Sequence, residues 1–187
     1  MRRSLCCALL TVLALVVAPL AAGTARASSQ RETGLEQGIL REVNRVRSDH
    51  GLHPLALSRG LQASAAYQSR VLLAQGVFEH DSAAGGAFGD RLRRFYPIGD
   101  APAWSVGENL LWGSDGIAAT AAVKLWLDSP VHRRIMLDPT WREFGVGAVN
   151  AASAPGVYAS AGAIVVVTID FGSRTPVSRT TAATSQR

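Results

Sequence analysis

The stretch from Phe144 to Phe171, FGVGAVNAASAPGVYASAGAIVVVTIDF, decides the fold, because its short apolar runs are typical of β-strands. It predicts strands over 145–149, 157–159 and 164–171, separated by links rich in Ala, Ser, Pro and Gly. Upstream of Phe144 the pattern is helical. Three strands that follow several helices predict an α+β layered domain with antiparallel pairing.

The helical part of the chain shows apolar residues at a spacing of three to four, as in Leu35, Ile39 and Val43. Serine and aspartate are good N-caps, glycine ends helices, and proline suits the first helical position. We expect helices from Leu35 to a stop at Gly51, from an N-cap at Ser58 to Gly76, from Phe88 to Tyr96, from a cap at Asp115 past Trp126, and from Ser129-Pro130 to Pro139. The segment between Pro97 and Gly107 is expected to be irregular.

The N-terminus has the pattern of a signal peptide. Arg2 and Arg3 precede an almost wholly apolar run from Leu9 to Leu20, and Ala25-Arg26-Ala27 supplies the small-x-small motif that a signal peptidase reads. The run is shorter than the roughly 20 residues that span a bilayer, and no transmembrane segment is expected in the mature chain. The sequence therefore predicts a signal peptide over 1–27 and a soluble protein secreted to the extracellular space.

The mature chain is expected to be one domain. Residues 28–34 are polar and small and read as a flexible segment, residues 35–173 form the domain, and residues 174–187 read as a disordered tail. Both cysteines, at positions 6 and 7, fall in the predicted signal peptide. The domain must therefore be stable without disulfides and has no cysteine nucleophile.

The positive charge of the chain does not indicate a nucleic-acid partner. The formal net charge is +5, but three of the 19 basic residues lie in the predicted signal peptide, which leaves 16 against 14 acidic residues. The one local cluster, Arg91, Arg93 and Arg94, is interpreted as a solvated helix face. No nucleic acid is expected to bind.

Several short motifs occur in order along the chain. They are Val43-Asn44-x-x-Arg47 with Gly51-Leu52-x-Pro54-Leu55, Phe78-x-His80, Gly107-Glu108-Asn109-Leu110, Trp126-x-x-Ser129-Pro130-x-His132-Arg133, Gly145-Val146-Gly147, and Thr168-Ile169-Asp170-Phe171. On these motifs the sequence resembles the CAP superfamily (SCP-like; cysteine-rich secretory protein, antigen 5, pathogenesis-related 1) in its short bacterial secreted form. The resemblance covers residues 35–172. It implies a three-layer α-β-α sandwich with a small antiparallel sheet, and a cleft in which two histidines and two acidic residues can hold a divalent metal.

By motif match, the resemblance assigns His80, Glu108 and His132 to three of the four cleft positions. Many relatives place a glutamate just after the tryptophan that matches Trp126, whereas this chain offers the shorter Asp128 as the fourth candidate. Imidazole is a good zinc ligand, and a carboxylate can complete such a site or orient a ring through its second nitrogen. Zinc is the metal we expect, with Glu108 as third ligand or as general base if the site is hydrolytic.

Each of these residues could instead have a purely structural role. The two histidines and Glu108 could serve only as loop and cap hydrogen-bond partners. The four tryptophans, at 104, 112, 126 and 141, could form an aromatic groove, but core packing is the simpler interpretation. If Ser129 caps its helix, His132 lies in the first turn, where the helix dipole disfavours an added proton.

Three classes of function follow. We favour a non-enzymatic extracellular binding or interaction module that recognises an extracellular or cell-wall ligand, with a divalent-metal cleft. A metal-assisted hydrolase of peptide bonds and a sterol or lipid binder are the alternatives. The mature chain has no HExxH helix, no GxSxG elbow and no SxxK motif, which disfavours the hydrolases that use them.

Overall fold

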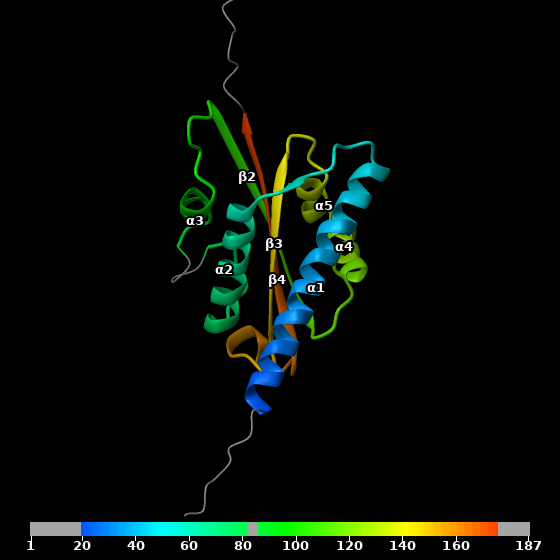
Figure 1. Ribbon diagram of the computed structural model, residues 1–187, viewed down its shortest axis with the longest axis vertical. Helices are drawn as coiled ribbons and strands as arrows, with labels where there is room; N and C mark the ends of the chain where they lie inside the picture. The colour runs from blue at the N-terminus through cyan, green and yellow to red at the C-terminus, as the bar shows by residue number, and fades with distance from the viewer. Residues whose placement is uncertain (1–19, 82–85, 176–187) are drawn as a thin grey trace, which may run out of the picture.

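The computed structural model describes residues 20–81 and 86–175, in which one four-stranded sheet lies between two layers of helices (Figure 1). The elements are α1 (Leu20–Asp49), β1 (Ala56–Leu57), α2 (Arg59–Gln75), α3 (Phe88–Phe95), β2 (Ala103–Ser114), α4 (Ala119–Asp128), α5 (Pro130–Met136), β3 (Glu143–Ala151), the 3₁₀ helix η1 (Gly156–Tyr158) and β4 (Ile164–Thr175). The predicted α+β class and three-layer sandwich are confirmed.

The strand order is β1-β3-β4-β2, so β2 lies at one edge of the sheet. The long strands β2, β4 and β3 pair antiparallel as predicted, while the two-residue β1 pairs parallel to β3, which makes the sheet mixed. Side chains alternate between the two faces of each strand. In β4, Val165, Val167 and Ile169 join the core with α1 and α4, whereas Ile164 and Val166 pack with Leu72 of α2.

Helix α2 lies directly on the backbone of β3. A Cβ atom at Gly145 would lie 2.1 Å from the N of Gln62, and one at Gly147 would lie 2.2 Å from the N of Ala66. Both ends of α2 are as predicted: Ser58 is the N-cap and accepts from the backbone N–H of Leu61, and the helix ends at a glycine in the left-handed region, Gly76 (φ 68°). The glycines of β3 therefore permit α2 to pack directly against the strand backbone.

Two strand predictions were wrong. Of the residues predicted as a strand over 157–159, the first two belong to η1 and the third is its C-cap. The Val157 N–H donates to the Gly76 carbonyl and the Tyr158 hydroxyl donates to the Val77 carbonyl. The second half of the segment expected to be irregular, residues 103–107, is the start of the twelve-residue strand β2, which pairs along its whole length with β4. Its central Gly-Glu-Asn sequence has low strand propensity, which the ladder to β4 overrides.

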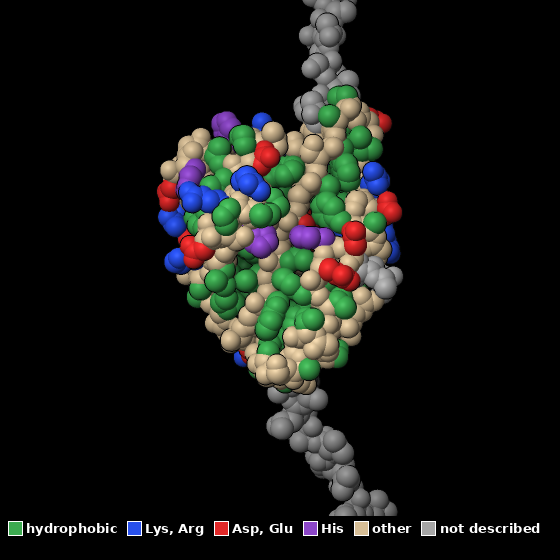
Figure 2. Space-filling view, turned by 180° about the vertical axis from the view of Figure 1, so that it is seen from behind, with side chains coloured by type: hydrophobic (Ala, Val, Ile, Leu, Met, Phe, Trp, Pro, Cys, Tyr) green, Lys and Arg blue, Asp and Glu red, His purple; other side chains and the backbone are tan. Residues whose placement is uncertain are grey.

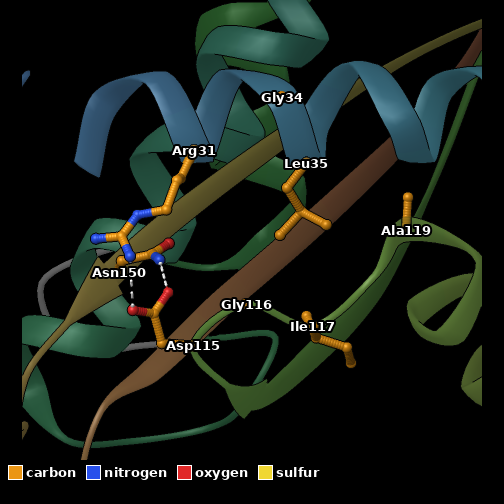
Figure 3. A pocket seen from close by; sticks show the side chains of 8 residues that line it. All are labelled: Arg31, Gly34, Leu35, Asp115, Gly116, Ile117, Ala119 and Asn150. Carbon is orange, nitrogen blue, oxygen red and sulfur yellow. Dashed lines mark hydrogen bonds and ion pairs between the residues drawn. The ribbon is translucent and has the colours of Figure 1, made fainter. Parts of the chain in front are cut away.

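Residues 31–35 of α1 are attached to the sheet around a cavity of about 230 Å³ (Figure 3). Arg31 forms an ion pair of 3.5 Å with Asp115, and the side-chain amide of Asn150 donates to the same carboxylate. The backbone N–H of Asn150 donates to Glu32 at 2.9 Å. Residues 28–34, expected to be flexible, thus lie within α1.

The predicted cap at Asp115 was also wrong. Helix α4 begins at Ala119 and its N-cap residue, Ala118, makes no side-chain bond. Asp115 instead bonds across the cavity to Asn150 and Arg31. The three remaining predicted helices are confirmed as α2, α3 and α5, and Gly51 follows the end of α1 in the left-handed region (φ 69°).

Most of the predicted signal peptide and of the C-terminal tail lies outside the described residues, and cleavage after Ala27 stays a prediction. No helix within residues 20–81 and 86–175 is long and apolar enough to cross a membrane.

The contact between α2 and β3 predicts a large effect of a single methyl group. Gly147→Ala should lower the free energy of unfolding by about 3 kcal/mol, since the new Cβ meets helix backbone that cannot move alone. Gly34→Ala is the control, because nothing lies within 4 Å of its Cβ and alanine favours the helix; it should leave stability unchanged or raise it by up to about 1 kcal/mol. Urea unfolding measures both, and equal stability of the two variants would contradict the packing described.

Candidate functional site

A cavity of about 460 Å³ opens at the β2 edge of the sheet. Because side chains alternate along β2, Val106 and Glu108 reach it from the face covered by α2 and α3, while Gly107 borders it on the other face. The lining residues are His80, Asp81, Phe88, Val106, Gly107, Glu108, Ile135 and Trp141. The cavity therefore lies between the two helical layers.

His80 and Glu108 form the polar part of the cavity. The Nδ1 of His80 lies 2.7 Å from Oε1 of Glu108. The His80 side chain is 53 % exposed, whereas that of Glu108 is 1 % exposed. The hydrogen bond to Glu108 raises the pKa of His80, against the opposing effect of partial burial. One ring edge of the histidine is thus fixed, and the ring remains accessible from the cleft.

The backbone of the His80 loop is held by α2. The side-chain amide of Gln68, fully buried, donates to the carbonyls of Glu79 at 3.1 Å and His80 at 3.2 Å. The carboxylate of Asp81 accepts from the Phe88 N–H at 2.6 Å, which joins the same loop to the start of α3. These bonds place His80 against the sheet edge.

Arg91 corrects the expectation of a solvated arginine cluster. Arg93 is exposed as predicted, but the Arg91 side chain is fully buried beneath the cleft. Its guanidinium forms a short hydrogen bond to Oε2 of Glu108 and donates to the His80 carbonyl at 3.2 Å. A buried guanidinium beside a buried carboxylate compensates a charge that would otherwise be costly to bury.

Asp170 is a second buried acid at this point. It lies directly opposite Glu108 on β4, is fully buried, and lies 3.9 Å from the Arg91 guanidinium. Within the described part of the chain neither of its carboxyl oxygens has a hydrogen-bond partner of ordinary geometry. Burial raises its pKa, and the negative charge of Glu108 raises it further. Asp170 therefore keeps its proton to a higher pH than an exposed aspartate does.

His132 lies on α5, in the opposite helical layer, near His80 but outside the set of residues that line the cavity. Its carbonyl accepts from the side-chain amide of Asn109 at 3.0 Å. Burial lowers the pKa of His132, and the positive charge of His80 lowers it further, so the two rings lie near each other. Pro130 occupies the first turn of α5 as predicted, although Ser129, at the N-cap position, makes no side-chain cap bond. Figure 2 shows two histidine side chains close together near the middle of one face, with apolar side chains around them.

The remaining wall of the cavity is apolar. Trp141 is 7 % exposed, donates its indole N–H to the Ile135 carbonyl at 2.7 Å, and stacks on Phe171 with ring centres 6.1 Å apart. A Cβ at Gly107 would lie 2.8 Å from the Trp141 ring. Of the four tryptophans, Trp126 is buried in the core as predicted, whereas Trp141 also lines the cleft.

The sequence-predicted site residues do not all meet. His80 and Glu108 are in contact and His132 is their neighbour, but Asp128 is exposed at the end of α4 and binds Lys124 at 2.7 Å. Among the residues that the structure describes, no group of three or more His, Cys, Asp or Glu side chains could hold a metal ion. Both oxygens of Glu108 are already hydrogen-bonded. The side chains present therefore match a site with two imidazole ligands, in which the carboxylate of Glu108 orients the His80 ring and is not itself a ligand.

Sequence reasoning missed Arg91 and Asp170 as parts of this site. Asp170 stands in the quoted motif Thr168-Ile169-Asp170-Phe171, in which an aspartate between large apolar residues of a strand was the available signal. The sequence carries no such signal for Arg91, since Arg93 and Arg94 follow it on the same short helix and are of the same residue type. Only the packing of α3 distinguishes the buried Arg91 from these two arginines.

Comparison with known sequences agrees with this architecture. The pattern of the cysteine-rich secretory protein family (CAP) matches residues 40–169. The Bacillus subtilis (strain 168) protein YkwD is 29% identical over 118 residues, which are 63% of this chain and 44% of YkwD. The membrane protein YlbC of the same organism is 30% identical over 116 residues, 62% of this chain and 32% of YlbC. The chain thus spans less than half the length of these two relatives.

Solved structures show the same fold. An extracellular protein of Bacillus anthracis (strain Ames) that contains an SCP domain is 27% identical with a TM-score of 0.62; the match covers 80% of this chain and 43% of that one. An outer surface protein of Borrelia burgdorferi, 18% identical, has a TM-score of 0.54, with 73% and 90% of the two chains covered. At that identity the likeness concerns the fold alone.

The hydrogen bond between Glu108 and His80 predicts a measurable titration. Glu108→Gln removes the negative charge that stabilises the protonated ring, so the pKa of His80 should fall below the ordinary histidine value, because partial burial then dominates. Asp128→Asn, at an exposed carboxylate paired with Lys124, is the control and should leave it unchanged. NMR titration of the ring C–H signals measures both, and an unchanged pKa in the Gln variant would rule out this coupling.

Proposed function

Because the chain belongs to the cysteine-rich secretory protein (CAP) family, we propose that it is a secreted, non-enzymatic binding module whose ligand enters the cleft at the β2 edge. The observation that carries the proposal is the composition of this cleft. Apolar side chains of Phe88, Val106 and Ile135 line one part of it, and His80 stands at the other. Binding sites typically combine a mostly apolar wall with a few polar groups that orient the ligand.

The geometry of Glu108 supports binding over hydrolysis. A general base needs an oxygen that can reach the proton it removes. In this cleft one oxygen of Glu108 accepts from Arg91 and the other lies 2.7 Å from the His80 ring, and the side chain is 1 % exposed. This arrangement fixes the position of His80 and leaves neither oxygen of Glu108 without a hydrogen bond.

Export of the protein is part of the proposal. The N-terminal pattern of Arg2-Arg3, an apolar run and Ala25-Arg26-Ala27 supports it. The extracellular location named for the Bacillus anthracis protein supports it as well. The exported chain would begin at Ser28, which N-terminal sequencing tests.

The cleft should bind a small apolar probe. We expect 8-anilinonaphthalene-1-sulfonate to bind the wild-type protein with increased fluorescence, and Val106→Gln to weaken binding about tenfold, as expected for the loss of about 1.4 kcal/mol of apolar contact. Leu125→Gln, at an apolar residue on α4 that is 50% exposed and outside the cleft, should bind as the wild type does.

Absence of dye binding to the folded wild-type protein, or equal weakening in both variants, would overturn the proposal. Competition then separates the ligand classes. Displacement of the dye by a sterol favours a lipid binder, whereas displacement by peptides favours an interaction module.

A divalent metal ion is the second candidate ligand. His80 and His132 would hold it, with Glu108 orienting His80 through Nδ1, since a ligating imidazole usually binds a carboxylate or carbonyl through its other nitrogen. A bound metal would supply a Lewis acid to a ligand in the cleft. Asp128 is not favoured as a ligand, because its side chain is exposed and forms an ion pair with Lys124.

Zinc titration tests the metal candidate. We expect calorimetry to detect binding to the wild type that weakens at least about tenfold in a His80→Ala, His132→Ala double variant. The matched control is His50→Ala, His53→Ala, which removes two exposed histidines near the end of α1 and should bind zinc normally. No binding to the wild type, or equal loss in both double variants, would exclude the cleft as a zinc site.

A further inference from the structure

We propose that Arg91 is the positioning residue of the cleft, because its guanidinium holds the backbone of His80 directly and its ring through Glu108, and thereby selects which nitrogen of that ring meets the ligand. The inference rests on the proposed function in one respect only, namely that the ligand occupies this cleft. It adds a prediction of which kind of chemical group on the ligand binds His80.

Three nitrogens of Arg91 bind in three directions. Nε donates to the Ser64 hydroxyl at 3.3 Å, Nη1 donates to the His80 carbonyl at 3.2 Å, and Nη2 forms the short bond to Oε2 of Glu108. The side chain is fully buried and lies over the ring of Phe88, 5.5 Å from its centre. A lysine has a single nitrogen without this planar fork and could satisfy only part of the arrangement.

The pairing of Glu108 with Asp170 explains why a guanidinium is required here. The two acids lie directly opposite each other on adjacent antiparallel strands and point to the same face. Without Arg91, the Glu108 carboxyl could turn to share a hydrogen bond with Asp170. With Arg91 bound to Oε2 and 3.9 Å from Asp170, Oε1 of Glu108 stays directed at the His80 ring.

The consequence concerns the His80 tautomer. A carboxylate only accepts hydrogen bonds, so Nδ1 carries the proton that it donates to Glu108. In the neutral ring Nε2 is then unprotonated and offers a lone pair to the cleft. The group of the ligand that meets His80 should therefore be a hydrogen-bond donor, such as a hydroxyl or amide N–H, or a cation, and should not be a carbonyl oxygen.

The experiment measures the tautomer directly, without ligand. Ring ¹⁵N chemical shifts of His80 are recorded at a pH where the ring is neutral, in the wild type, in Arg91→Lys and in Arg93→Lys. We expect the Nδ1-protonated form to dominate in the wild type and to fall about tenfold relative to the Nε2-protonated form in Arg91→Lys, the factor that one net hydrogen bond gives. Arg93→Lys, on the exposed face of the same helix, should match the wild type.

A second variant covers the case in which Arg91→Lys does not fold. Ser64→Ala removes the partner of Nε, together with the effect of this hydroxyl on Asp170, and keeps the buried charge of Arg91, so the tautomer ratio should move in the same direction by a smaller factor. Wild-type tautomer populations in a folded Arg91→Lys variant, or in Ser64→Ala if that is the one that folds, would overturn the proposal. Because no ligand is present, this result is independent of dye binding, whose failure would count against the proposed function alone.

Discussion

The structure around the cleft depends on one constraint, the burial of the Glu108 carboxylate in an edge strand. A buried carboxylate must be compensated by hydrogen bonds and positive charge. Arg91 supplies both from α3, and His80 supplies the second bond from the loop after α2. The positions of α3, of this loop and of the sheet edge are therefore set together. Removing the side chain of Arg91 or of Glu108 would leave the other as an uncompensated buried charge.

The layered architecture explains why the cleft holds residues distant in the chain. His80 and Arg91 come from the layer of α2 and α3, whereas His132 and Ile135 come from α5 in the opposite layer. Residues of both layers border the cavity at β2, which lies at one edge of the sheet. The spacing of the layers is limited on one side by the contact of α2 with the glycines of β3. The distance between the two histidines thus depends on packing far from them.

The same arrangement bears on what the cleft can do. Its apolar wall is anchored by Trp141, whose indole is fixed by a hydrogen bond and by stacking on Phe171. Its polar groups are bonded to one another, with Arg91, Glu108 and His80 forming a continuous chain of hydrogen bonds. Rigid polar groups beside a rigid apolar wall are suited to recognition, because little ordering is required when a ligand binds.

The sequence alone determined the elements whose signals are local. The Ser58 cap and Gly76 stop delimit α2, the apolar runs over 145–149 and 164–171 become β3 and β4, and the ordered motifs identified His80, Glu108 and His132. Only the tertiary structure decided the rest. The strand β2 owes its existence to a twelve-residue ladder with β4, some 50 to 70 positions further along the chain, and Arg91 differs from the exposed Arg93 only because α3 turns it toward Glu108 and Asp170. Pairing and charge compensation between distant segments leave no trace in a local pattern, since each depends on a partner that the local sequence does not contain.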